Sequence, residues 1–170
     1  MFNTRSGNLF LAALSLVFLA GCASYQAGDG TALPFSSIKI DPVVNQSFAP
    51  QINPVMNHDL REAFIQKSKI QVDSTTPDTQ LSVTLTQYNR DTIATNSQDT
   101  GLARKYELTL TASCDLIDLN ESKPLFSSRE VSATVDIFLD AGQTQAETNA
   151  IPLLSKKLAE AIANEVLQVW

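Results

Sequence analysis

The sequence predicts an α+β domain in which two amphipathic helices pack on one face of a mixed, mostly antiparallel sheet of four to five strands. Three observations lead to this prediction. Apolar and polar residues alternate in three long segments, which is the period of a half-buried strand. Two other segments repeat apolar residues at helical spacing. Short strand-like segments flank the first of these helices, so the expected order is β-α-β-β-β-β-α.

The predicted domain opens with a strand and a helix. Ser37–Ile40 alternates as a strand does, and Pro42 ends it. Asn53 followed by Pro54 indicates a helix N-cap and first helical position, and the helix then runs to about Ser68. Its apolar residues are Met56, Leu60, Ala63 and Phe64.

Four strands are expected next, and the first of them is the short segment Ile70–Val72. If this strand is parallel to the opening strand, the two strands and the helix between them form a right-handed crossover. Alternation predicts one apolar face for the three long strands, formed by Leu81, Val83, Leu85, Tyr106, Leu108, Leu110, Ala112, Cys114, Val131, Ala133, Val135 and Ile137. The intervening residues are rich in serine and threonine. The parity slips at Ile117 and Leu119, which indicates a bulge or the end of the strand.

A second amphipathic helix is expected from about Thr148 to Trp170. Its apolar stripe is formed by Ile151, Leu154, Leu158, Ile162 and Val166. Pro152 fits only if it lies in the first turn, because it would kink a helix interior. Both helices should cover the apolar sheet face. The opposite, hydroxyl-rich face is then either solvated or a neutral docking surface for a partner or a polar, elongated ligand.

Residues 1–21 are predicted to be a signal peptide, with Cys22 as a lipidated first residue of the mature chain. Arg5 precedes the apolar run Leu9–Ala20, and small residues lead into the cysteine of Leu19-Ala20-Gly21-Cys22. The run is too short for a bilayer, which takes about 20 apolar residues. The alternative is an ordinary secretory signal that contains a cysteine. We expect acylation of Cys22, as in bacterial lipoproteins.

Residues 22–34 should form the lipidated N-terminus and a tether, because they are mostly small and polar and include Gly28 and Gly30. Residues 35–170 suffice for a single α+β domain. We expect no transmembrane segment in that domain. By resemblance to lipoprotein sorting in bacteria with two membranes, the absence of aspartate after Cys22 favours the periplasmic side of the outer membrane.

Charge and cysteine content narrow the classes of function. The full chain has a net charge of −6, and removal of the signal, whose one charged residue is Arg5, brings it to −7. Such a chain is a poor match for nucleic acid or for a polybasic membrane contact. Once Cys22 carries lipid, Cys114 has no partner for an internal disulfide. Cys114 is expected to be a small buried residue rather than a nucleophile.

Little in the sequence suggests catalysis, and we expect a protein that is not an enzyme and has no metal or cofactor. His58 is the one histidine, on the polar side of the first predicted helix, and a general base also needs a positioned partner. Zinc would need more ligands, and no glycine-rich loop follows a strand to hold phosphate. Two acidic pairs could be imagined as acid and base but fit better as solubilising charges, namely Asp115 with Asp118 and Asp136 with Asp140.

Three basic residues form a candidate ligand site. Arg90, Arg104 and Lys105 bracket the long turn between two of the predicted strands, so they could gather at one end of the sheet. Arginine matches phosphate groups well, so an anionic head group is the ligand to consider. Alternatively, Asp91 and Asp99 neutralise these residues in ordinary surface pairs.

Several segments resemble the lipopolysaccharide-assembly lipoprotein family LptE. They are Cys22–Tyr25, Ile38–Asn45 with Phe48 and Pro50, Leu60–Phe64, Gln80–Tyr88, Tyr106–Leu110 and the C-terminal amphipathic helix. The resemblance covers nearly the whole mature chain, and it consists of fold patterns rather than a catalytic signature. It implies a non-enzymatic protein that sits inside the barrel of LptD, helps that barrel to assemble and contacts lipopolysaccharide. It assigns no ligand residue in this chain.

Three functions follow as hypotheses. The first is an outer-membrane scaffold or plug of an LptD-like β-barrel translocon in lipopolysaccharide assembly, with that barrel and lipopolysaccharide as partners. The second is a free periplasm-facing binding module for a soluble or cell-wall ligand. The third is a hydrolase that uses Asp118, Asp136 or His58. Co-purification with a barrel protein separates the first hypothesis from the second.

Overall fold

Two helices and six strands make up the described part of the chain, which in this computed structural model comprises residues 33–95, 103–138 and 142–168, without the side chains of residues 94–95 and 103–104. In chain order the elements are β1 (Ser37–Ile40), β2 (Val44–Asn45), α2 (Ile52–Lys67), β3 (Gln71–Val72), β4 (Thr79–Thr95), β5 (Ala103–Asp118), β6 (Lys123–Phe138) and α3 (Gln143–Gln168). The predicted signal peptide, Cys22 and the tether up to residue 32 lie outside the described residues, and their assignments stay predictions.

The strands form one mixed sheet in the order β3-β1-β4-β5-β6, and β2 pairs with β4 beside β1. Strand β1 runs parallel to β3 and to β4, so β1, α2 and β3 form the expected parallel crossover. The three long strands β4, β5 and β6 are antiparallel. The α+β class and the element order are confirmed, with the two-residue strand β2 as an addition that the sequence did not predict.

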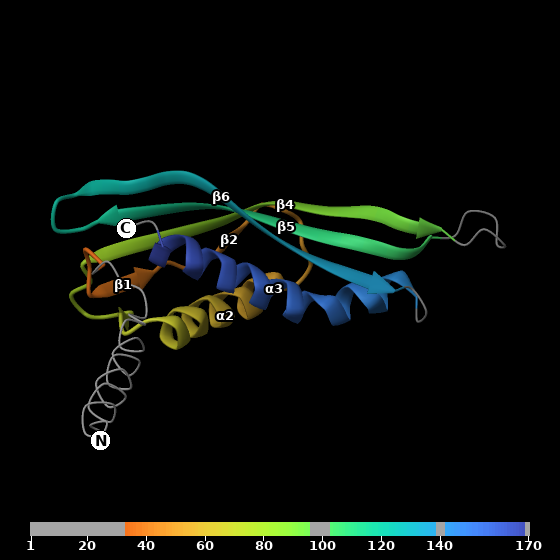
Figure 1. Ribbon diagram of the computed structural model, residues 1–170, viewed down its shortest axis with the longest axis horizontal. Helices are drawn as coiled ribbons and strands as arrows, with labels where there is room; N and C mark the ends of the chain where they lie inside the picture. Colours follow the sequence, from red (N-terminus) through yellow and green to blue (C-terminus); the bar gives the residue numbers. More distant parts are fainter. Residues whose placement is uncertain (1–32, 96–102, 139–141, 169–170) are drawn as a thin grey trace, which may run out of the picture. The chain divides into compact units, whose positions relative to one another are not determined.

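Both helices lie on the same side of the sheet, where they pack against each other (Figure 1). The apolar stripes of α2 and α3 are buried as predicted. The core between the layers contains fully buried side chains from both helices and from the sheet, among them Ile38, Met56, Leu60, Phe64, Leu81, Leu85, Leu108, Leu110, Leu154 and Leu158. The amphipathic periodicity therefore identifies the faces correctly.

Helix α2 begins earlier than predicted. Its N-cap residue is Gln51, with a left-handed φ of 51° and no capping hydrogen bond from its side chain, so the prediction of Asn53 as N-cap is wrong. Ile52 is 1 % exposed. Because burial of this side chain in the core is favourable, the helix begins at Ile52. Pro54 still lies within the first turn, where its missing N–H costs no helical hydrogen bond.

Helix α3 also begins earlier, at Gln143 rather than near Thr148, and Pro152 lies in its interior. The first turn follows Gly142, whose φ of 93° suits glycine and whose carbonyl accepts a hydrogen bond from the Ala146 N–H at 3.1 Å. Buried Ile151 holds the helix against the core beside Pro152. Packing on both sides of the proline therefore extends a helix that local propensity would start later.

The slip predicted at Ile117 and Leu119 coincides with the end of β5 at Asp118, and the bulges beside it lie in β6, because Leu116 is still buried while Ile117 and Leu119 are exposed. The pairing of β5 with β6 shifts register on both sides of Leu116, and the strand continues to Asp118. In β6 the bulge includes Ser128, which has a φ of 52° and donates its backbone N–H to the Asp115 carboxylate at 2.8 Å. Asp115 thus stabilises the bulge in β6 by accepting this hydrogen bond.

An arginine side chain links α2 to the strands of the crossover. The Arg61 guanidinium contacts the Asp73 carboxylate at 2.7 Å and donates to the carbonyl oxygens of Asn57 at 2.9 Å and Ile40 at 3.2 Å. Asp73 in turn accepts the Ile40 N–H at 3.1 Å. These bonds satisfy the backbone N–H and carbonyl groups of Ile40 at the end of β1 and link them to Asp73, which follows β3.

Asp78 ties the start of the domain to the start of β4. One of its carboxylate oxygens accepts hydrogen bonds from the Ser36 N–H at 2.8 Å, the Ser36 hydroxyl at 2.8 Å and the Ser37 N–H at 3.1 Å. The Ser36 backbone bond is the main cause of a lowered Asp78 pKa, about 2 against an ordinary 3.8, with further lowering from the Ser36 hydroxyl and from Ser37.

The lowered Asp78 pKa predicts an acid-dependent stability. A carboxyl group whose pKa falls on folding stabilises the native state above its unfolded pKa, and the contribution disappears as the pH falls towards 2. We expect Asp78→Asn to lose this part of the pH dependence between about pH 4 and pH 2, as measured by urea unfolding at several pH values. Ser36→Ala, which keeps the backbone donor, should lose less. An Asp78→Asn profile with the wild-type slope would contradict the assignment.

Candidate functional site

The sheet face opposite the helices is lined by hydroxyl side chains, and we call it the hydroxyl face. Its members come from all three long strands and are Ser82, Thr84, Thr86, Thr109, Thr111, Ser113, Ser132 and Thr134. None of these side chains is buried, whereas most of their neighbours along each strand are buried in the core. The predicted separation of an apolar face and a hydroxyl-rich face is therefore present.

Hydroxyl groups on this face bond to one another across the strands. The Thr109 and Thr134 hydroxyls are 3.3 Å apart, and those of Thr111 and Ser132 are 3.0 Å apart. The Thr86 hydroxyl donates to the Thr111 carbonyl at 3.3 Å. Each hydroxyl still has donor or acceptor capacity for a further partner. The two hydroxyl pairs thus form an uncharged patch suited to hydrogen bonding, bordered on the same face by Glu130 opposite Ser113 and by Glu107 opposite Asp136.

At one end of the hydroxyl face, Lys105 pairs with an acid. Its ammonium group lies 2.7 Å from the Asp136 carboxylate and 5.7 Å from the centre of the Phe138 ring. Lys105 is opposite Phe138 in the pairing of β5 with β6. Lys105, a predicted ligand residue, is therefore already part of an ion pair on this face.

Arg90 lies on the other side of the sheet. In the pairing of β4 with β5 it is opposite Leu108, which is fully buried beneath the helices, and directly opposed residues share a face. The Arg90 guanidinium lies 3.0 Å from the Glu147 carboxylate of α3. The side chain of Arg104 lies outside the described residues. Arg90 and Lys105 thus do not form one patch, and a ligand role for Arg90, Arg104 and Lys105 stays a prediction.

The acidic residues of the hydrolase hypothesis are far apart. Asp118 is opposite Lys123 at one end of β5, whereas Asp136 is opposite Glu107, eleven residues earlier on β5. At about 3.3 Å per residue, this places them roughly 35 Å apart along the sheet. Asp118 accepts the backbone N–H groups of the β5–β6 turn at 2.7 and 3.0 Å. Asp140 lies outside the described residues.

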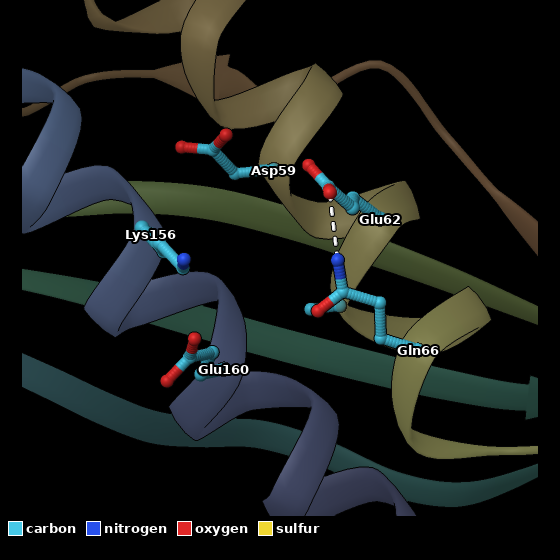
Figure 2. A pocket seen from close by; sticks show the side chains of 6 residues that line it. Asp59, Glu62, Gln66, Lys156 and Glu160 are labelled. Carbon is cyan, nitrogen blue, oxygen red and sulfur yellow. Dashed lines mark hydrogen bonds between the residues drawn. The ribbon is translucent and has the colours of Figure 1, made fainter.

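Helices α2 and α3 meet in a small polar groove (Figure 2). Its lining side chains are Asp59, Glu62, Ala63, Gln66, Lys156 and Glu160. Figure 2 shows that Lys156 and Glu160 of α3 face the acidic side chains of α2, with Gln66 donating to Glu62 at 2.7 Å. The volume of about 20 Å³ holds roughly one water molecule. The groove is therefore a polar contact between the helices.

His58 belongs to the same part of α2. Its side chain is 75 % exposed and lies 3.4 Å from the Glu62 carboxylate. Ligand atoms of His58, Asp59 and Glu62 lie within 4.8 Å of one another. Asp59, however, accepts a 2.6 Å hydrogen bond from Ser155 of α3, and Glu62 binds Gln66. Glu62 thus bonds within α2 and Asp59 bonds across to α3, while His58 lies exposed on the polar side of the helix, as predicted.

Cys114 is buried, at 1 % exposure, in the apolar face of β5. Burial is the main reason that its pKa rises to about 12, with smaller contributions from the charges of Asp115 and Glu165. The thiol therefore stays protonated at neutral pH and lacks nucleophilic character. The prediction of a small buried residue is confirmed.

Sequence reasoning missed one surface feature, the turn between β2 and α2. Its side chain Phe48 is 95 % exposed at a left-handed φ of 62°. A signal was available, because residues 42–57 contain no charged side chain in a chain that is otherwise acidic. Beside this turn lies a hollow of about 210 Å³, formed by the start of α2 and by α3.

The family model described as lipopolysaccharide-assembly, LptE, matches residues 35–166. The chain belongs to the LptE family. The match covers all of the strands, α2 and almost all of α3, so it includes the hydroxyl face and the Phe48 turn. The resemblance inferred from the sequence is thereby confirmed.

Solved structures of low sequence identity share the fold of this LptE-family chain. An uncharacterized lipoprotein B from Nitrosomonas europaea is 19 % identical, with a TM-score of 0.51 over 80 % of this chain and 82 % of that one. A minor lipoprotein from Acinetobacter baumannii is 12 % identical, with a TM-score of 0.52 over 79 % and 94 %. A protein from Xanthomonas campestris is 11 % identical, with a TM-score of 0.56 over 81 % and 88 %.

No curated protein matches the chain significantly by sequence. Within the described ranges, neither helix combines the length and the apolar character that crossing a bilayer requires. Family membership and fold are thus the two results of the comparisons.

Proposed function

We propose that this chain is a lipoprotein of the outer membrane that acts as a non-enzymatic scaffold or plug of an LptD-like β-barrel in lipopolysaccharide assembly. The observation that carries the proposal is the match of residues 35–166 to the LptE family. The arrangement of the domain supports it, because the helices complete a core on one side of the sheet and no described helix or strand covers the hydroxyl face.

The chemistry of the hydroxyl face suits the inside of a barrel. The interiors of outer-membrane barrels are polar, and a plug must exchange hydrogen bonds with that lining without leaving buried charges unpaired. The hydroxyl pairs Thr109–Thr134 and Thr111–Ser132 provide uncharged donors and acceptors. At the end of the face Lys105 pairs with Asp136, and Glu107, which lies opposite both Asp136 and Asp91, adds negative charge there. The hydroxyl centre of this surface can be buried against polar side chains at low electrostatic cost, whereas its acidic end would need cationic groups of the partner.

Acylation of Cys22 would supply the membrane location. Each buried methylene of an acyl chain contributes about 0.8 kcal/mol, and more than one chain makes the attachment stable. A short tether after Cys22 would also keep the domain at high effective concentration near a barrel in the same membrane. The anchor and the tether would explain how a small scaffold domain stays at a membrane surface.

The proposed contact with lipopolysaccharide is not assigned to particular residues by family membership. A negative chain needs a local basic site for an anionic ligand. Arg90 and Lys105 pair with Glu147 and Asp136, so a phosphate group would have to compete with these carboxylates. If Arg104→Glu combined with Lys105→Glu leaves lipopolysaccharide binding unchanged, this site is ruled out.

The proposal is tested by purifying the tagged full-length lipoprotein from native membranes in mild detergent. We expect an LptD-like barrel protein, identified by mass spectrometry, in about equimolar amount. An unrelated tagged outer-membrane lipoprotein, expressed at the same level, serves as the control and should recover none. Recovery of the chain as a monomer without the barrel would contradict the proposal and favour the free binding module.

A further inference from the structure

The turn between β2 and α2 displays one aromatic side chain to solvent. Phe48 is 95 % exposed, although the residues on either side, Ser47 and Ala49, are 6 % and 3 % exposed. Its φ of 62° lies in the left-handed region, which bulky residues rarely adopt. An aromatic residue that gains no burial and occupies an unfavourable backbone conformation contributes nothing to the stability of the isolated domain.

The turn is rigid, because Asn45 clamps both sides of Phe48. The Asn45 side-chain oxygen accepts the Ser47 N–H at 3.0 Å and the Ser47 hydroxyl at 2.7 Å. The Asn45 amide group donates to the Ala49 carbonyl at 2.9 Å. Strand β2 itself is held by parallel pairing with β4. Phe48 is thus presented in a fixed position, which lowers the entropy lost when a partner binds it.

A hollow adjoins this turn. Its volume is about 210 Å³, and its lining comes from Pro50, Gln51 and Val55 on one side and Thr148, Ile151 and Pro152 of α3 on the other. The turn therefore combines a projecting aromatic ring with a neighbouring cavity. We call this combination the Phe48 knob and hollow.

The surroundings carry no charge. Residues 42–57 and 148–155, which supply the knob and the hollow, contain no acidic, basic or histidine side chain. Of the flanking cations, Lys39 and Arg61 are paired with Asp41 and Asp73. Lys156 lies in the polar groove between α2 and α3, and Lys157 donates to the Thr134 carbonyl. An anionic bilayer is usually contacted through basic residues beside the inserted side chain, and the two segments that form the knob and the hollow supply none. A concave hollow also suits a protein side chain, whereas lipid requires no such shape.

We propose that the Phe48 knob and hollow is a docking site for an uncharged, apolar socket on the barrel partner, a local exception to the polar lining that meets the hydroxyl face. This inference rests on the proposed function and extends it, because it adds a second contact besides the hydroxyl face. Phe48 enters the socket, and an apolar side chain of the barrel enters the hollow. Aromatic anchors in preformed positions commonly dominate the binding energy of such interfaces.

Phe48→Asn tests the docking site in the full-length tagged lipoprotein. Asparagine tolerates a left-handed φ, so the thermal midpoint should stay the same or rise. Recovery of the LptD-like barrel should fall about tenfold, as expected for the loss of an aromatic anchor. Ile65→Ala is the matched control, because Ile65 is 63 % exposed on α2 and away from the hollow. Ile65→Ala should recover the barrel at the wild-type level.

A photocrosslinking amino acid provides an independent measurement. With p-benzoylphenylalanine in place of Phe48, illumination of cells should give a covalent product with the LptD-like barrel, and the same residue at position 65 should not. Wild-type recovery of the barrel by Phe48→Asn, or a crosslink to lipid alone, would overturn the docking site while leaving the proposed function intact. Failure of the wild-type chain to recover the barrel would instead overturn the proposed function and the docking site together.

Discussion

Phe64→Ala should lower the free energy of unfolding by about 3–5 kcal/mol, the usual range for removing a buried aromatic side chain. Phe64 is fully buried and projects from α2 into the core between helices and sheet. Alanine removes most of the side chain, and the surrounding residues come from both layers, so they can only partly fill the cavity. For a domain of this size, the thermal midpoint should fall by roughly 10–20 °C.

The neighbouring residue provides the control for this prediction. Ile65 is 63 % exposed, so Ile65→Ala should change the unfolding free energy by no more than about 0.5 kcal/mol. Both values can be measured by urea unfolding of the same preparation, followed by circular dichroism. Equal effects of the two substitutions would show that α2 does not present the face assigned to it.

Cys22→Ser should abolish lipid attachment and release the protein from the membrane fraction. Serine lacks the thiol to which the lipid would be attached, and no helix of the described residues replaces the anchor. We expect loss of labelling by radioactive palmitate, together with loss of barrel recovery, because the effective concentration near the membrane partner falls. Membrane fractionation and intact-mass measurement of the purified chain check the result.

The second cysteine serves as the control for lipidation. Cys114 is buried at 1 % exposure, so Cys114→Ala should keep the palmitate label and the membrane location. Persistence of the label in Cys22→Ser would contradict the assignment of the processing site. Loss of the label in Cys114→Ala would point to a different modified residue.

Long-range packing explains why the helix boundaries were harder to predict than the helices. The stripes from Met56 to Phe64 and from Ile151 to Val166 follow from periodicity, and both are buried. The start of α2 depends on the burial of Ile52, and the early start of α3 depends on contacts such as the ion pair between Glu147 and Arg90. Both features depend on residues that are far apart in the sequence, so the local pattern does not reveal where either helix begins.

The candidate site was predicted only in part. The hydroxyl face follows from the alternation of serine and threonine with apolar residues, because side chains along a strand point alternately to opposite faces. The exposure of Phe48 does not follow from sequence, since phenylalanine is usually buried and a left-handed φ has no reliable signature for this residue. Charge depletion over residues 42–57 was the available indication.

The sequence by itself determined the α+β class, the order of the elements, the buried stripes and the family, because these depend on periodic patterns along the chain. Only the tertiary structure decided which side chains meet. A register shift in β4 between Leu85 and Gln87 reverses the parity of the strand, and Arg90 consequently turns to the helix side while Lys105 stays on the hydroxyl face. One extra residue in a strand moves every later side chain to the opposite face of the sheet. The position of that bulge depends on pairing with the neighbouring strand rather than on the local sequence.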